Sequence, residues 1–79
     1  MNKTVFITGV SRGIGKALAE KFLSEGYGVV GTSTSGKASW NHKNLTLLKL
    51  NLSLSNSIEE CVKSFTKLNK KIDILINNA

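Results

Sequence analysis

Short apolar segments alternate with helix-like segments along this chain, and this alternation constrains its fold more than any other feature. Segments 13–25 and 55–69 carry apolar residues at the spacing of a helix that is buried on one side. Between and around them lie short stretches of β-branched and leucine residues, which are typical of buried strands. The expected strands are 4–8, 28–33, 45–52 and 72–76. The order β-α-β-loop-β-α-β predicts a parallel sheet with right-handed crossovers.

The predicted architecture is an α/β fold whose four parallel strands have the spatial order 3-2-1-4, with one helix on each face. We expect the first helix to end at Glu25-Gly26, because glycine tolerates a left-handed conformation there. We expect Ser53 or Ser55 to cap the second helix. The apolar residues expected to face the sheet are Ile14, Ala17, Leu18 and Phe22 in the first helix and Ile58, Cys61, Val62, Phe65 and Leu68 in the second.

A glycine-rich turn joins the first strand to the first helix. Unpaired amides and a positive dipole at the start of a helix make such a turn an anion site. Gly9 permits the tight turn, Gly13 leaves room for a pyrophosphate, and Gly15 lets the helix lie close to the strand. The alternative is a purely structural turn, but its position after a first strand and before an amphipathic helix favours phosphate binding.

Two motifs resemble those of the short-chain dehydrogenase/reductase family. Thr8-Gly9-Val10-Ser11-Arg12-Gly13-Ile14-Gly15 is similar to the family's T-G-x-x-x-G-I-G motif, and residues 73–79, Asp-Ile-Leu-Ile-Asn-Asn-Ala, are similar to its D-I-L-V-N-N-A segment. Segments 30–35 and 50–52 most resemble the ketoacyl-(acyl-carrier-protein) reductases. The resemblance implies that residues 1–79 form the amino-terminal part of an NAD(P)-binding Rossmann-type domain.

The implied function is an oxidoreductase that transfers hydride between a nicotinamide and a carbonyl or alcohol substrate. The family's catalytic serine and Tyr-x-x-x-Lys pair would follow Ala79, so we expect a longer reductase and no catalytic residue in this chain. Tyr27, the sole tyrosine, is not followed by x-x-x-Lys. The expected cofactor-binding residues are Gly9, Val10, Ser11, Arg12, Gly13, Ile14, Gly15, Thr34, Asn51, Leu52, Asn78 and Ala79.

The residues after the second strand favour NADP(H) over NAD(H). An acidic residue there would bind the free 2′-hydroxyl of the adenosine ribose and repel a 2′-phosphate. No Asp or Glu lies between Glu25 and Glu59; the segment instead has hydroxyl residues at 32–35 and a lysine at 37. The family resemblance assigns contacts with the 2′-phosphate to Arg12 and Thr34. The alternative for Arg12 is a solvated loop charge.

Asparagines lie at the ends of two of the expected strands, at the carboxyl edge, where ligands bind in open α/β sheets. The resemblance places Asn51 near adenine, although a strand-end turn residue is the alternative. It implies that Asn78 and Ala79 approach the cofactor ribose, whereas Asn77 mainly ties strands together. Trp40 could cover adenine or the sheet, and we favour packing.

Composition narrows the other function classes. The chain has 79 residues, a net charge of +6, 41% hydrophobic residues and one cysteine. These values argue against disorder and against a disulfide framework. We expect Cys61 to be a core thiol, His42 a loop residue, and no metal site. With no signal peptide or apolar span, we expect a cytoplasmic protein and no membrane partner.

Two rival functions stay open from the sequence. One is a stand-alone, non-catalytic dinucleotide-binding module. The other is a basic nucleic-acid-binding domain, which the scattered lysines make less favoured than a small-molecule enzyme. For the full-length reductase the resemblance implies a homo-oligomer.

Overall fold

The computed structural model describes residues 3–78 and contains one parallel sheet of four strands. The elements are β1 (Thr4–Ile7), α1 (Gly13–Ser24), β2 (Gly28–Ser33), β3 (Leu45–Lys49), α2 (Ser55–Leu68) and β4 (Ile74–Ile76). The strand order is β3-β2-β1-β4, which confirms the predicted order 3-2-1-4. All three pairings are parallel, so the carboxyl ends of the strands meet at one edge.

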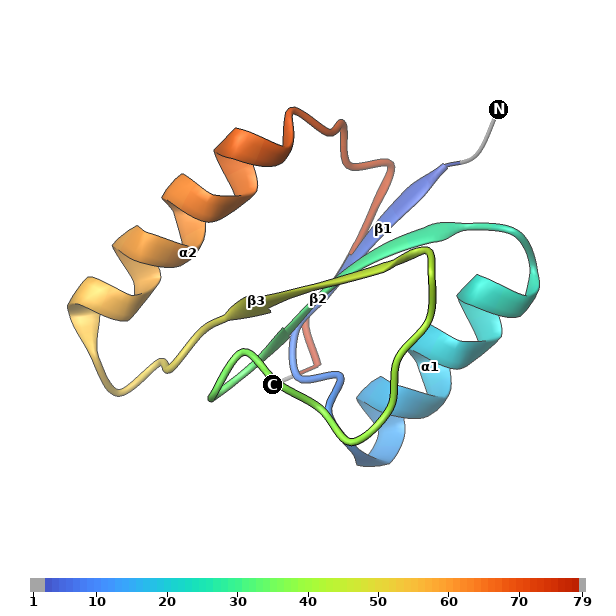
Figure 1. Cartoon of the computed structure of the whole chain (residues 1–79), viewed down its shortest axis with the longest axis horizontal. Helices are drawn as coiled ribbons and strands as arrows, with labels where there is room; N and C mark the ends of the chain where they lie inside the picture. The colour runs from blue at the N-terminus through green and yellow to red at the C-terminus, as the bar shows by residue number, and fades with distance from the viewer. Residues whose placement is uncertain (1–2, 79) are drawn as a thin grey trace.

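The two helices cover opposite faces of the sheet (Figure 1). Alternate residues of β1 and β2 divide the core between these faces. Val5 and Val29 pack with Ala19 and Leu23 of α1, whereas Val30 packs with Cys61 of α2. The prediction of one helix on each face is therefore confirmed.

The buried side of α1 differs from the predicted one. Gly15, Ala19 and Leu23 are buried, whereas Ile14 is 73% exposed and Ala17 is exposed. Leu18 and Phe22 are partly buried and pack against the core cluster as predicted, so only Ile14 and Ala17 depart from the predicted stripe. Gly15 faces inward because it lies directly against the backbone of the glycine turn, and this turns Ile14 outward.

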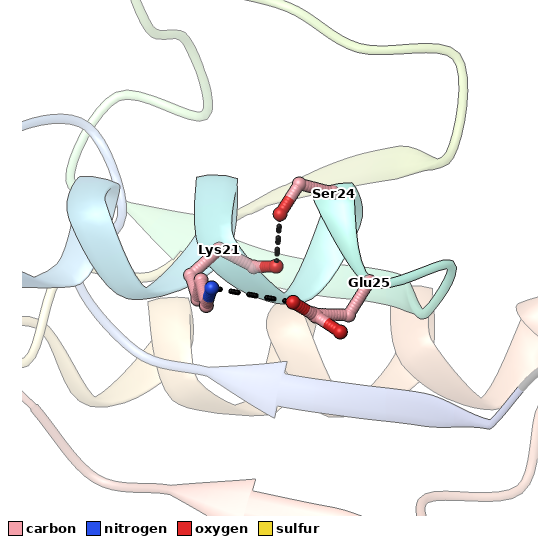
Figure 2. A network of polar contacts seen from close by, with 3 residues as sticks. All are labelled: Lys21, Ser24 and Glu25. Atoms are coloured by element: carbon pink, nitrogen blue, oxygen red, sulfur yellow. Dashed lines mark hydrogen bonds and ion pairs between the residues drawn. The ribbon is translucent and has the colours of Figure 1, made fainter.

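The end of α1 lies where the sequence predicts it. Gly26 has a φ of 91° and its amide bonds to the Leu23 carbonyl. On the solvent side, Lys21 Nζ lies 3.2 Å from Glu25 Oε2, and the Ser24 hydroxyl donates to the Lys21 carbonyl (Figure 2). Surface pairs of this kind contribute at most about 1 kcal/mol. The backbone turn thus determines the helix end more than the ion pair does.

Strand β3 ends at Lys49, three residues earlier than predicted, because its partner β2 ends at Ser33. The Leu50 amide makes one more bond, to the Ser33 carbonyl. The chain then turns around Asn51, whose Oδ1 accepts bonds from both the amide and the hydroxyl of Ser53. The residue that precedes α2 is Leu54, with no side-chain cap. The predicted cap was wrong, since the Ser53 hydroxyl bonds to Asn51 and Ser55 already lies in the helix.

Helix α2 buries a narrower face than predicted. Ser57 and Cys61 are buried, and Phe65 packs edge-on against Phe6 with ring centroids 5.5 Å apart. Ile58 and Val62, which were expected inside, are 42% and 59% exposed. The helix packs mainly on β3 and leaves a hollow of about 210 Å³ toward β4. Phe6, Cys61, Val62, Phe65, Ile72 and Leu75 line this hollow.

Strand β4 is anchored at its start by Asp73. The Thr4 amide donates to Asp73 Oδ2 at 2.9 Å, and the Asp73 amide donates to the Thr4 carbonyl. The strand, Ile74–Ile76, is two residues shorter than the predicted 72–76 segment. No helix within residues 3–78 is long and apolar enough to cross a membrane.

Candidate functional site at the carboxyl edge of the sheet

The glycine turn leaves the end of β1 and is fixed by the neighbouring strand β2. Gly9 has a φ of 70°, which favours glycine, and its amide donates to the Thr32 hydroxyl at 3.1 Å. The Val10 amide donates to the Thr32 carbonyl at 2.9 Å. Thr32 is buried, so one residue of β2 holds two successive amides of the turn from inside the protein.

The first backbone amides of α1 have no partner among residues 3–78. Arg12 precedes the helix in an extended conformation, makes no side-chain cap, and is exposed. The first turn of α1 has no acidic residue. Gly13 has a φ of 64°, and a β-carbon there would meet no described atom within 4 Å. A pyrophosphate fits these features, because it needs open space beside amides at a positive helix end.

Gly15 makes a close approach of a different kind. A β-carbon at this position would overlap the Gly9 carbonyl oxygen and lie 2.6 Å from Asn78 Nδ2. Asn78 Nδ2 in turn donates to the Gly9 carbonyl at 3.1 Å. The predicted close packing at Gly15 is confirmed, although its partners are the turn itself and the residue after β4.

The two asparagines after β4 both bond to residues of the β1 end. The Asn78 amide donates to the Thr8 hydroxyl at 2.8 Å, and that hydroxyl donates to Asn77 Oδ1 at 3.3 Å. Asn77 thus links strand ends as expected, while being exposed. Asn78 supports the turn directly, beyond the ribose role that the resemblance implies. Ala79 lies outside the described residues.

A pocket of about 220 Å³ lies beside the glycine turn, at the ends of β2 and β3. It brings together four predicted site residues from three separate segments: Gly9, Thr34, Asn51 and Leu52. Its other lining residues are Thr32, Ser33, Leu50 and Ser53. None of the lining residues is acidic, so the predicted absence of a carboxylate at the end of β2 extends to the whole pocket.

Only some of the hydroxyl residues at 32–35, which end and follow β2, are available to a ligand. The Thr32 hydroxyl accepts from Gly9, and the Ser33 hydroxyl donates to the Lys37 carbonyl at 2.9 Å. Ser35 accepts from the Lys37 amide, while Thr34 is exposed. The sequence alone did not show which hydroxyls are bonded within the protein and which are exposed, because the burial of Thr32 and Ser33 depends on how β2 pairs in the sheet.

Asn51 adopts the turn role that the sequence left open. Its side-chain oxygen accepts two bonds from Ser53, and its backbone amide donates to the Ser57 hydroxyl. Its side-chain nitrogen has no partner within residues 3–78 and belongs to a residue that lines the pocket. One side of Asn51 therefore stabilises the turn, and the other can donate to a ligand.

Val10 contributes to the site through packing. Its side chain is fully buried and contacts Gly31 of β2, where any β-carbon would overlap Val10 Cγ2. Both backbone groups of Val10 are bonded within the protein, the amide to Thr32 and the carbonyl to Trp40 Nε1. Val10 was predicted among the cofactor-binding residues, and within residues 3–78 its contacts support the turn. Gly31, a glycine within the apolar strand β2, was the sequence signal for this close contact.

Three further residues that the sequence singled out, His42, Tyr27 and Cys61, have their own contacts. His42 Nδ1 accepts a bond from the Asn44 amide, and no group of metal ligands occurs among residues 3–78. Tyr27 precedes β2, at the opposite edge from the glycine turn, and packs edge-on against Phe22. Cys61 is buried, and desolvation raises the pKa of its thiol. None of these three residues faces the pocket beside the turn.

The sequence of this chain matches the family model described as "short chain dehydrogenase" over residues 3–79. The chain belongs to the short-chain dehydrogenase family. Among curated relatives, the 3-oxoacyl-[acyl-carrier-protein] reductase of Buchnera aphidicola is 42% identical over 98% of this chain and 34% of the relative. The enzyme of that name from Vibrio cholerae is 39% identical with the same coverage. The chain thus spans about a third of the length of these relatives.

Solved structures agree with this membership of the short-chain dehydrogenase family. A short-chain dehydrogenase from Leptospira borgpetersenii with bound NAD+ superposes with a TM-score of 0.83 at 31% identity, over 99% of this chain and 31% of that one. ElxO with NADP bound gives a TM-score of 0.79 at 31% identity, over 100% of this chain and 35% of that one. The Rossmann-type fold predicted from the sequence is therefore confirmed.

Proposed function

We propose that the carboxyl edge of this sheet binds a nicotinamide dinucleotide. The observation that carries the proposal is the convergence of the uncapped start of α1 with the pocket at the ends of β2 and β3. The amides from Gly13 to Gly15 would hold the pyrophosphate. The pocket that contains Thr34, Asn51 and Leu52 would hold the adenosine. When bound, the nicotinamide supplies a carbon that donates or accepts hydride.

We propose further that NADP(H) is preferred over NAD(H). The pocket lining contains no carboxylate, so nothing in it repels a 2′-phosphate or binds a free 2′-hydroxyl through two acceptor oxygens. The exposed Thr34 hydroxyl and the exposed Arg12 guanidinium supply donors that suit a dianion. Relatives of known structure bind either cofactor, so this preference depends on the residues of this chain.

For the whole protein we propose hydride transfer between NADP(H) and a carbonyl or alcohol. The names of the curated relatives favour a 3-oxoacyl thioester as the carbonyl substrate. This chain would provide the dinucleotide half of the reaction. The group that protonates the carbonyl oxygen would come from outside the described residues, because Tyr27 lies at the far edge of the sheet. A cytoplasmic, homo-oligomeric enzyme is part of the same proposal.

A pair of glycine substitutions tests the proposal. Gly13 and Gly26 lie at opposite ends of α1, both have positive φ, and a β-carbon added at either residue would meet no described atom within 4 Å. Valine at either position brings a similar backbone strain of about 1–3 kcal/mol. We expect Gly13→Val to abolish NADPH binding in calorimetry and Gly26→Val to retain it. Equal NADPH affinity in the two variants would refute the phosphate site.

A further inference from the structure

Trp40 reaches the glycine turn from the segment between β2 and β3. Figure 1 shows this segment, in green, curving toward the start of α1. The indole Nε1 of Trp40 donates to the Val10 carbonyl at 3.0 Å. The ring is partly buried and packs against the core cluster that includes Val10 and Ala19. The packing role expected for Trp40 is thus confirmed, and a polar contact with the turn accompanies it.

This contact fixes the orientation of one peptide group. The Val10 carbonyl and the Ser11 amide belong to the same planar unit, and no peptide bond in residues 3–78 is cis. In a trans peptide the N–H points away from the carbonyl oxygen, so the Ser11 amide points away from the Trp40 indole. No described residue accepts a hydrogen bond from that amide. A bond to the carbonyl also polarises the amide and strengthens it as a donor.

We propose that Trp40 is a positioning residue for the dinucleotide and acts through the Val10–Ser11 peptide. The inference rests on the proposed function. The indole holds the Val10 carbonyl on the core side of the turn, so that the Ser11 amide stays directed at the anion site. Val10 itself cannot shift, because its side chain is fully buried against Gly31 and its amide is bonded to Thr32.

The test compares Trp40→Phe with Phe22→Leu in the purified protein. Trp40→Phe keeps an aromatic ring but removes the N–H donor. Phe22→Leu is the matched control. Phe22 packs against the same core cluster, but its side chain has no hydrogen-bond donor for the glycine turn. The ligands are NADP+, which carries a pyrophosphate, and adenosine 2′-monophosphate, which does not. Dissociation constants are measured by calorimetry well below the melting temperature of each variant.

We expect Trp40→Phe to weaken NADP+ binding about three- to ten-fold, the range for one lost hydrogen bond. Its affinity for adenosine 2′-monophosphate should change less than about two-fold, and Phe22→Leu should leave both constants unchanged. Unchanged NADP+ affinity, or equal weakening of both ligands, would overturn the role of Trp40. Failure of the unaltered protein to bind either NADP+ or NAD+ would instead remove the proposed function.

A second measurement needs no substitution at Trp40. The sequence contains one tryptophan, so the indole N–H gives a single proton resonance. If an anion binds the Ser11 amide, the bond at the Val10 carbonyl strengthens and this resonance moves downfield when NADP+ is added. A resonance that stays at the same position at saturating NADP+ contradicts the proposal, even if Trp40→Phe does not fold.

Discussion

Gly31→Ala is expected to destabilise the protein, because Gly31 packs against Val10 of the glycine turn. The added methyl group would overlap Val10 Cγ2 and lie 2.9 Å from Cγ1. Neither partner can yield easily, because Gly31 is paired with Ile7 and Leu47 in the centre of the sheet and Val10 is fully buried. Overpacking of this kind costs about 1–3 kcal/mol, and alanine recovers about 0.5–1 kcal/mol relative to glycine in a strand.

The net loss of about 1–2 kcal/mol should lower the melting temperature by about 4–8 °C per kcal/mol. Val10→Ala provides the matched test, because it removes the two methyl carbons that the new β-carbon would strike. Alone, it should cost about 2 kcal/mol for lost burial and a small cavity. In the double variant the alanine at position 31 fills that cavity, so the two losses should not add.

Urea unfolding of the four proteins measures this coupling. We expect the loss of unfolding free energy in the double variant to be smaller than the sum of the two single losses by at least about 1 kcal/mol. The m-values should not change. Additive losses would show that Gly31 and Val10 do not share one space, and the packing account of the turn would fail.

Three further predictions concern other parts of the chain. Gly15→Ala should destabilise the fold by about 1–3 kcal/mol in urea unfolding, whereas Gly28→Ala, whose β-carbon would meet nothing closer than 3.8 Å, should be neutral or stabilising. Arg12→Ala combined with Thr34→Asp should shift the ratio of NADP(H) to NAD(H) affinities at least about ten-fold toward NAD(H), and a constant ratio would contradict the 2′-phosphate assignment. Because burial raises the pKa of the Cys61 thiol, the unfolded thiol ionises first as pH rises, so the free energy of unfolding should fall with pH above about pH 8. Cys61→Ala should remove that part of the decrease, as measured by unfolding at a series of pH values.

The strand order and helix positions were predictable because hydrophobic periodicity and the glycine motif are local signals. The side of α1 that faces the sheet was not, because Gly15 has no side chain that a hydrophobic pattern can register. Only the contact with the Gly9 carbonyl reveals why Ile14 faces outward. The start of α2 at Ser55 was predicted, but its capping residue was not. Ser53 is a good cap by residue type, but Asn51 takes its hydroxyl.

The candidate site follows the same division. The loop residues from Gly9 to Gly15 and the polar positions Thr34 and Asn51 were predicted from their places after strands. The residues that hold the loop were not, since Thr32 and Trp40 act through bonds to a turn more than twenty residues away in sequence. No local pattern records such bonds, because they depend on how the strands are paired.

The position of β4 at the edge of the sheet has a consequence for folding during synthesis. Asp73 bonds to Thr4 and Asn78 bonds to Gly9, across 69 residues of sequence in each case. Closing such a long loop carries an entropic cost that local helix formation does not. During synthesis, the glycine turn would leave the ribosome early yet gain its last supports only when residues 73–78 emerge. A nucleotide would therefore meet a fully supported turn only after residues 73–78 have emerged and β4 has paired with β1.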